Sequence, residues 1–339
     1  MPDDQTYEAA GVSIERGERA VSLMRSAVDR THGPNVISYP GGFAGLFALA
    51  GYKDPVLAST IDGVGTKVLV AKELGHYDSL GTDIVNHCAN DVLATGARPL
   101  LFLDYVASGR LEPEAVAGVV RGAAEACEEL DVALVGGETA EMPGLYAEGD
   151  LEVVGVCVGA CERSYAVTGE RVRVGDAILG LPSSGLHTNG YTLARKVIED
   201  SGLSYADAPG GMDRSVGEIY LEPHRAYVRE VAALREAVEV RGMAHITGGG
   251  LPGNLPRSLG GRGARLQTSC WDEPPVFGLI RSLGQIPEDE MRRVFNLGIG
   301  FCAVVPPEEA ERGLETLRSV GCGAWRIGEV VEEGGVEFA

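Results

Sequence analysis

The hydrophobic and polar residues of this chain follow two alternating patterns. Short apolar runs of strand length end in polar turns rich in glycine, and most of these turns precede a stretch whose apolar residues recur at helical spacing. This order of apolar strand, glycine-rich turn and helix appears four times. It predicts a mixed α/β (α+β) fold in which ligands bind at the ends of strands.

The spacing of apolar residues assigns most of the individual elements. Helices are expected at 14–28, 67–74, 78–95, 113–130 and 191–201, with a further helix starting at Pro223. Strands are expected at 100–106, 132–135, 151–161, 177–181, 299–305 and 325–330. The strand at 132–135 is expected to end in a turn that begins with Gly136 and Gly137. The strand at 151–161 is apolar with few charges, which predicts cover on both of its faces.

The polar, charged segment at 165–175 marks the expected domain boundary. A chain of 339 residues exceeds one typical hydrophobic core. We therefore expect an N-terminal domain at 1–168 and a C-terminal α/β domain at 169–339, with a single large domain as the alternative.

Composition narrows the class of partner. The chain has 29 Lys and Arg against 49 Asp and Glu, a net charge of −20, which argues against nucleic acid or an anionic membrane as a partner. Its seven cysteines are scattered without a C-x-x-C pair, as in a reduced protein. With no signal peptide and no apolar run near membrane-spanning length, the sequence predicts a cytoplasmic protein. Phosphorylated substrates would then require a locally positive site.

The first candidate site follows the apolar run at 56–61. Asp62 is a candidate metal ligand there, Gly63 and Gly65 permit a tight turn with exposed N–H groups, and Thr66 and Lys67 follow. The alternative for this turn is simple chain reversal.

Three carboxylates form the second candidate site. Asp62, Asp91 and Glu138 each adjoin an apolar segment and a Gly or Asn, as oxygen ligands of magnesium often do. Each one alone is equally compatible with a helix cap or a solvated carboxylate. If they converge, repulsion should raise the pKa of at least one of them.

Five segments in one order resemble the phosphoribosylformylglycinamidine cyclo-ligase family, also called aminoimidazole ribonucleotide synthetases. The resemblance extends from about Tyr7 to Val330, and its most specific run is Gly-Gly-Glu-Thr-Ala-Glu-Met-Pro-Gly. The segments are Asp62–Lys67, Asn90–Asp91 with Gly96–Pro99, Gly136–Gly144, Ser183–Tyr191 and His245–Gly250.

The resemblance implies a fold and a reaction. The N-terminal mixed sheet would pair with that of a second subunit to form a barrel in a homodimer, with ATP and substrate in clefts near the interface. The reaction would be ATP-dependent closure of the imidazole ring in purine synthesis, through phosphorylation of the formyl oxygen and attack by a substrate nitrogen, with release of ADP and phosphate.

The resemblance also assigns residues to small-molecule nucleotide ligands. For ATP and Mg²⁺ they are Asp62, Gly63, Gly65, Thr66, Lys67, Asn90, Asp91, Gly136, Gly137, Glu138 and Thr139, with Asp62, Asp91 and Glu138 on the metal. For the ribose phosphate or reacting group they are Ser184, Gly185, His187, Asn189, Thr247, Gly248, Gly249 and Gly250. His187, Lys67 and Asp91 form the expected catalytic set.

Histidines supply the candidates for proton transfer. His187 lies in a glycine-bounded turn and is the preferred general acid or base, with ordering of the loop as its alternative. We favour a structural role for His245 and a solvated or capping role for His87, which could otherwise orient Asp91.

Related ATP-using enzymes and a non-catalytic protein are the competing interpretations. Selenophosphate synthetase requires a reactive cysteine near its N-terminal glycine-rich loop, whereas the first cysteine here is Cys88. Formylglycinamidine ribonucleotide synthetase requires a longer chain or partner subunits. A nucleotide-sensing dimer without catalysis would be distinguished by a turnover assay.

Overall fold

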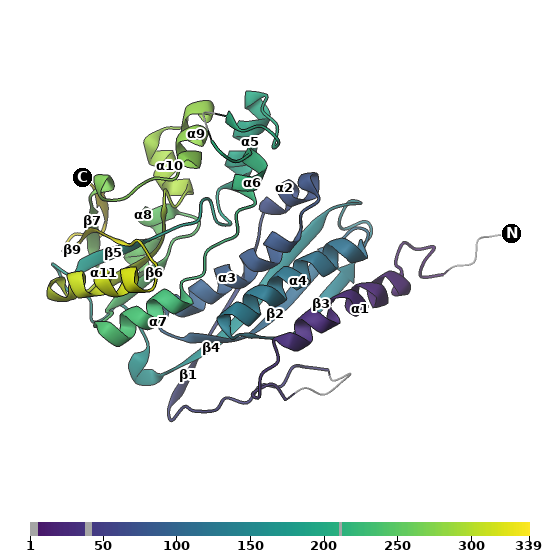
Figure 1. The fold of residues 1–339 in the computed structure, drawn as a ribbon, viewed down its shortest axis with the longest axis horizontal. Coiled ribbons are helices and arrows are strands. Elements are labelled where there is room, and N and C mark those ends of the chain that lie inside the picture. Colours follow the sequence, from purple (N-terminus) through teal and green to yellow (C-terminus); the bar gives the residue numbers. More distant parts are fainter. Residues whose placement is uncertain (1–5, 38–42, 210–211) are drawn as a thin grey trace.

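The fold is built on two β-sheets, one in each half of the chain (Figure 1). It is described from a computed structural model, which covers residues 6–37, 43–209 and 212–339. The strands are β1 (Pro55–Gly63), β2 (Arg98–Ser108), β3 (Ala133–Glu141), β4 (Leu151–Glu162), β5 (Ala177–Pro182), β6 (Gly242–His245), β7 (Gly263–Leu266), β8 (Ile299–Val305), β9 (Trp325–Val331) and β10 (Gly335–Phe338).

Helices pack on both sheets. They are α1 (Ile14–Arg30), α2 (Lys67–Leu74), α3 (Asp78–Ala94), α4 (Pro113–Leu130), α5 (Tyr191–Ser201), α6 (Val216–Tyr220), α7 (Val228–Ala237), α8 (Gly250–Asn254), α9 (Pro275–Gly284), α10 (Glu288–Val294) and α11 (Ala310–Ser319). None of the helices in the described ranges combines the length and apolar character needed to cross a bilayer. The mixed α/β class expected from the sequence is confirmed.

The N-terminal sheet has the strand order β1-β4-β2-β3, with only the β2–β3 pair parallel. One face is covered by α3 and α4, which lie side by side in Figure 1 with α1 beyond α4. Phe102 of β2 and Cys157 of β4 face these helices and are fully buried. Alternation along each strand therefore places every second residue in this core.

The opposite face of the same sheet is apolar and uncovered. Leu57 and Ile61 of β1 are 62% and 68% exposed, and Val154, Val156 and Val158 of β4 are only half-buried. The expected cover on both faces of β4 is therefore not supplied by the described residues of one chain.

The C-terminal sheet has the order β10-β7-β9-β5-β8-β6, and its strands β5, β8 and β6 are buried on both faces. Leu179 and Phe301 pack toward α7 and α11, whereas Ile178 and Cys302 pack toward α8. All seven residues of β8 are buried, which explains its continuous apolar sequence.

The expected turn at Gly136 is wrong, because the chain continues as strand β3 to Glu141. Residues 136–141 pair with 103–108 of β2 in a parallel ladder. A Cβ on Gly137 would lie 2.3 Å from Asp104 Oδ1, so glycine serves a close approach of two strands here.

The expected helix at Pro223 is also wrong, because α7 begins at Val228. Side chains of α3 bind the intervening backbone instead. Asn86 Nδ2 donates to the His224 carbonyl at 2.7 Å, and Asn90 Nδ2 donates to the Arg225 carbonyl at 2.8 Å. Asn90 Oδ1 accepts from Tyr227 N at 3.0 Å. These bonds satisfy backbone groups that a helix would otherwise pair, and they join the two halves of the chain.

We predict that Asn90→Asp lowers the free energy of unfolding by about 2–4 kcal/mol, because it places a carboxylate oxygen against the Arg225 carbonyl in a fully buried position. Urea unfolding at pH 7 measures the change. Asn35→Asp, at an exposed position, is the matched control. If both variants were as stable as the parent, the role of Asn90 in holding the backbone before α7 would be contradicted.

Candidate functional site

A cavity of about 560 Å³ lies where the ends of β1 and β6 meet α3. Its lining includes Asp62 from β1, Asp91 from α3, His245 from β6 and Thr247 just beyond it. Arg257 contributes the only Lys or Arg side chain among the described lining residues. The cavity thus gathers candidate residues that are far apart in sequence.

Asp62 and Asp91 converge on one imidazole nitrogen. His87 Nε2 lies 3.0 Å from Asp62 Oδ2 and 3.8 Å from Asp91 Oδ2, and the two carboxyl side chains remain 46% and 30% exposed. His87 itself is buried, so the expected solvated or capping role is wrong. Its Nε2 faces both carboxylates.

The pKa of both carboxyl groups is lowered, contrary to the expectation of a raised value. Burial opposes ionisation of Asp62, but His87 and the Gly63 N–H outweigh it and lower its pKa. Burial likewise opposes ionisation of Asp91, and bonds from His245 and Thr60 lower its pKa. Both groups are therefore anionic at neutral pH, ready to bind a cation.

Four of the six histidines form one buried cluster beside the cavity. His245 Nδ1 lies 2.8 Å from Asp91 Oδ1, and its Nε2 lies 2.9 Å from His224 Nε2. His187 stacks on His224 with ring centroids 3.9 Å apart. His245 is thus linked directly to a candidate metal ligand.

The histidine cluster is hydrogen-bonded and does not form a metal ligand set as it stands. Zinc with nitrogen ligands at about 2.0–2.1 Å in a tetrahedron separates those nitrogens by roughly 3.3 Å. The His224 and His245 nitrogens are closer, at 2.9 Å, and share one hydrogen.

His187 is buried at a left-handed backbone position, with φ 63°. Its Nε2 accepts from Ser184 N at 3.1 Å, and its Nδ1 has no partner among the described residues. Burial, followed by the neighbouring cations, holds its pKa well below the usual range. The imidazole is therefore neutral. His187 lines neither this cavity nor a second cavity, which is formed around Gly65, Thr66, Thr188 and Asn189.

Lys67 does not face a ligand space in this structure. Its ammonium is fully buried, 2.7 Å from Asp83, and donates to the Glu222 carbonyl at 2.8 Å and the His187 carbonyl at 3.4 Å. Burial lowers the pKa of Lys67 and raises that of Asp83. The expected phosphate contact is replaced by an internal ion pair.

Glu138 is separated from the other two carboxylates within one chain, which corrects the expected three-carboxylate set. Asp62 and Gly137 occupy the same row at opposite edges of the four-stranded sheet, roughly 14 Å apart at the usual strand spacing. Glu138, one residue further on, points to the uncovered face and is exposed. Gly136 and Thr139 lie with it on β3, and Asn90 is occupied by backbone bonds.

A second cavity of about 610 Å³ gathers other predicted residues. It is lined by Gly65 and Thr66 from the first turn and by Thr188 and Asn189 from the second. Lys196, which pairs with Asp200, and Glu290 also line it.

The remaining candidates have structural contacts. Ser184 Oγ donates to the Pro223 carbonyl at 2.6 Å, and Gly185 carries the turn at φ 143°. Asn254 Nδ2 binds the carbonyls of Thr247, Gly248 and Gly250, while Gly249 has φ 101°.

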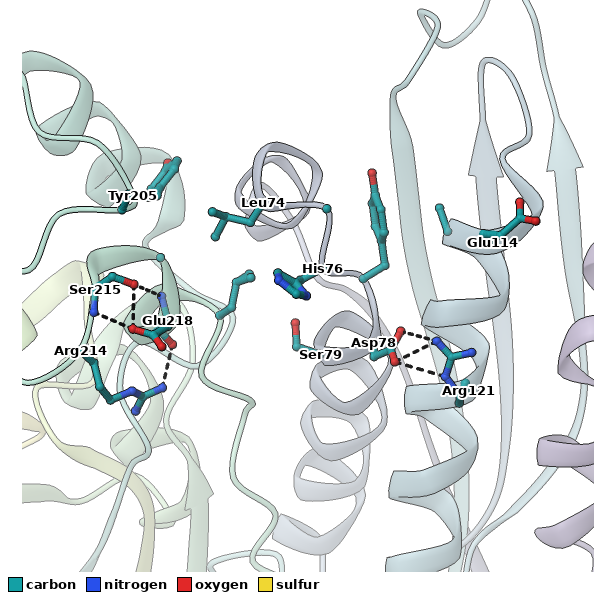
Figure 2. Close-up of a pocket in the computed structure, with 16 residues that line it drawn as sticks. Leu74, His76, Asp78, Ser79, Glu114, Arg121, Tyr205, Arg214, Ser215 and Glu218 are labelled. Atoms are coloured by element: carbon teal, nitrogen blue, oxygen red, sulfur yellow. Dashed lines mark hydrogen bonds and ion pairs between the residues drawn. The ribbon is translucent and has the colours of Figure 1, made fainter.

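Another cavity, of about 740 Å³, lies elsewhere, between the α2–α3 connection and residues 205–206 and 214–221 (Figure 2). Its charged lining residues are already paired: Arg121 binds Asp78 through three bonds, Arg214 binds Glu222, Glu218 caps α6 with Ser215, and Glu114 pairs with Arg19. No charged group among the described lining residues is left to recognise a ligand.

Sequence reasoning missed His224 and Asp83. His224 lies outside any glycine-rich turn, so no local pattern identified it. Asp83, with His87 four residues later, forms a polar stripe on a helix that is otherwise apolar and buried. This polar stripe was the pattern in the sequence that could have identified Asp83.

The comparisons with known proteins cover nearly the whole chain. Residues 44–161 match the AIR synthase related protein N-terminal domain, and residues 173–339 match the corresponding C-terminal domain. A phosphoribosylformylglycinamidine cyclo-ligase of Gloeobacter violaceus is 50% identical over 335 residues, covering 98% of this chain and 99% of the relative. A relative of the same name from Geobacillus kaustophilus is 47% identical and covers 99% and 98%.

Solved structures share the fold at low identity. Thiamine-monophosphate kinase from Stenotrophomonas maltophilia has a TM-score of 0.72 at 18% identity, covering 94% of this chain and 95% of that one. The hydrogenase maturation protein HypE in complex with ATP has a TM-score of 0.66 at 21% identity, covering 93% and 86%.

We predict that Lys67→Met lowers the free energy of unfolding by about 3–5 kcal/mol, because it leaves the Asp83 carboxylate buried without its cation. Lys67→Met/Asp83→Asn should recover a large part of this loss, because the unpaired charge is removed while the bond from His224 N is kept. Chemical denaturation checks both values.

Lys72→Met is the control, since Lys72 lies on the same helix but its side chain is 40% exposed. A Lys67→Met protein as stable as this control, with weakened nucleotide binding, would restore the phosphate-contact interpretation.

Proposed function

This chain belongs to the phosphoribosylformylglycinamidine cyclo-ligase family, and we propose that it catalyses ATP-dependent closure of formylglycinamidine ribonucleotide to aminoimidazole ribonucleotide. The protein is an enzyme of the ligase class. The observation that carries the proposal within the molecule is the convergence of Asp62 and Asp91 on one cavity. Two anionic groups at one point suit a metal-bound triphosphate in a chain whose net charge of −20 would otherwise repel it.

The proposed reaction has two steps. The formyl oxygen of the substrate attacks the γ-phosphorus, and the bond from phosphorus to ADP breaks. A substrate nitrogen then attacks the carbon that carries this phosphorylated oxygen. The bond between that carbon and the oxygen breaks, and phosphate is released. Phosphorylation is needed because an amide oxygen is a poor leaving group, and holding both groups in one site makes the closure intramolecular.

The carboxylate pair fits Mg²⁺. Magnesium is commonly bound by one or two carboxylates, with waters and substrate phosphates at its other positions. Asp62 and Asp91 supply such oxygens and stay accessible from the cavity. They would hold the ion, which when bound neutralises charge on the phosphate oxygens.

Arg257 and His187 are assigned supporting roles in the proposal. Arg257 is exposed and lines the cavity as its cation, so we assign it to an anionic oxygen of a nucleotide. The neutral His187 is assigned as the base that takes a proton from the attacking nitrogen. Because its ring is buried, this role requires the 184–189 turn to open around the ligand.

We also propose that two chains associate through the uncovered face of the N-terminal sheet. That face carries Leu57, Ile61 and the half-buried valines of β4, an apolar surface that monomeric proteins seldom expose. Association there would cover β4 on its second side and would give the barrel that the family resemblance implies. Glu138 would then lie within the interface.

The test of the reaction is incubation with formylglycinamidine ribonucleotide, ATP and magnesium, with aminoimidazole ribonucleotide, ADP and phosphate measured together. Asp91→Asn should raise the magnesium concentration for half-maximal rate by about tenfold or more, because one anionic ligand becomes neutral at nearly constant shape. Its effect on the melting temperature in metal-free buffer should be small by comparison.

Asp29→Asn, an exposed change of the same kind on α1, is the control and should leave the magnesium requirement unchanged. Absence of the product under all metal concentrations would refute the proposed activity. A marked loss of stability in Asp91→Asn without a change in magnesium requirement would identify Asp91 as structural.

For the dimer, we predict a single species of twice the chain mass in sedimentation velocity at micromolar concentration. Leu57→Glu should shift the protein toward the monomer, because twofold symmetry buries two new carboxylates in one apolar interface. Val320→Glu, 42% exposed at the end of α11, is the control. A fully active monomer would exclude this assembly.

A further inference from the structure

The hydroxyl of Thr188 lies at the centre of the histidine cluster. Thr188 is 7% exposed, and its Oγ1 lies 2.7 Å from His87 Nδ1 and 3.4 Å from His224 Nδ1. Asn189 Nδ2 donates to the same oxygen at 3.3 Å. One oxygen therefore contacts both of the histidines that lead to the two carboxylates of the site.

Hydrogen-bond counting constrains these contacts. A threonine hydroxyl donates one hydrogen and accepts at two lone pairs. Asn189 uses one lone pair, so the hydroxyl hydrogen serves only one of the two histidine Nδ1 atoms. The other Nδ1 must carry its own hydrogen and donate to Oγ1.

The ring contacts continue beyond Thr188 on both sides. His87 Nε2 lies 3.0 Å from Asp62 Oδ2. His224 Nε2 lies 2.9 Å from His245 Nε2, and His245 Nδ1 lies 2.8 Å from Asp91 Oδ1. The Thr188 hydroxyl therefore joins two chains of ring contacts, one ending at Asp62 and the other at Asp91.

We propose that Thr188 is a positioning residue: its hydroxyl fixes the ring orientation and the hydrogen-bearing nitrogens of His87 and His224. Through these rings it sets the direction in which Asp62 and Asp91 present their oxygens to the cavity. Partners of this kind, one contact removed from a metal, orient the ligands that touch it. The effect on magnesium rests on the proposed function, whereas the effect on the histidines does not.

The experiment compares Thr188→Val with Thr188→Ser. Valine removes the hydroxyl at nearly constant shape, and serine keeps it. In metal-free protein selectively labelled at histidine, ring-nitrogen NMR should show His87 and His224 with altered hydrogen positions in Thr188→Val and parent-like signals in Thr188→Ser. Magnesium binding in the presence of ATP, followed by calorimetry, should weaken about 10- to 100-fold in Thr188→Val and stay within about threefold of the parent in Thr188→Ser.

Two results would overturn the proposal. One is Thr188→Val with parent-like histidine signals. The other is a Thr188→Ser protein whose histidine signals and magnesium binding change as much as those of Thr188→Val. That result would assign the role to the methyl group and to packing. If valine prevents folding, Thr188→Ala supplies a hydroxyl-free variant without the added methyl group. A parent protein that binds no magnesium, or forms no product, would refute the proposed function, while the histidine signals would still decide the role of Thr188.

Discussion

The ion pair between Lys67 and Asp83 is the contact on which the rest of the structure depends. Both side chains are fully buried, and together they reach α2, α3, the turn at His187 and the backbone of Glu222 and His224. A charge in such a position is costly unless it is paired and hydrogen-bonded, and here the ammonium meets Asp83 and two carbonyls while Asp83 Oδ1 also accepts from His224 N. The pair therefore favours the arrangement in which these segments meet, and it links the two halves of the chain at α3.

The candidate site is assembled further along the same polar stripe of α3. α3 is apolar where it meets the sheet, and its polar side chains face the C-terminal half, where Asn86 and Asn90 hold the 224–227 backbone. His87 and Asp91 lie on this stripe and meet Asp62 and His245. One helix thus supplies both the structural link and two of the groups that face the cavity.

The electrostatics of the site follow from this packing. Hydrogen bonds and charge from the neighbouring histidines lower the pKa of Asp62 and Asp91 against the effect of burial, so both are anionic at neutral pH. The site stays attractive to a divalent ion although the protein as a whole is strongly acidic. Positive charge toward phosphate would then be supplied by the ion and by Arg257, and not by a lysine in the first turn.

The sequence by itself determined the local elements and the family motifs. The helices at 67–74, 113–130 and 191–201 and the strand at 299–305 match the structure, because apolar spacing, proline and glycine act within a few residues. The motif residues Asp62 and Asp91 line one cavity in the structure, and their role as metal ligands stays a prediction. Gly136 and Gly137 led to a wrong prediction of a turn. Glycine is favoured in tight turns, and it is also needed where two strands approach closely, as Gly137 approaches β2.

Only the tertiary structure decided which polar groups meet. Lys67 binds a carboxylate 16 residues away and a carbonyl 155 residues away, and no local pattern encodes the second contact. His224 joined the cluster, and Glu138 was placed on the opposite face of the sheet, through strand order and register. Burial and partner choice depend on how distant segments pack, and a side chain of one type serves as a ligand contact or as an internal counter-ion according to that packing alone.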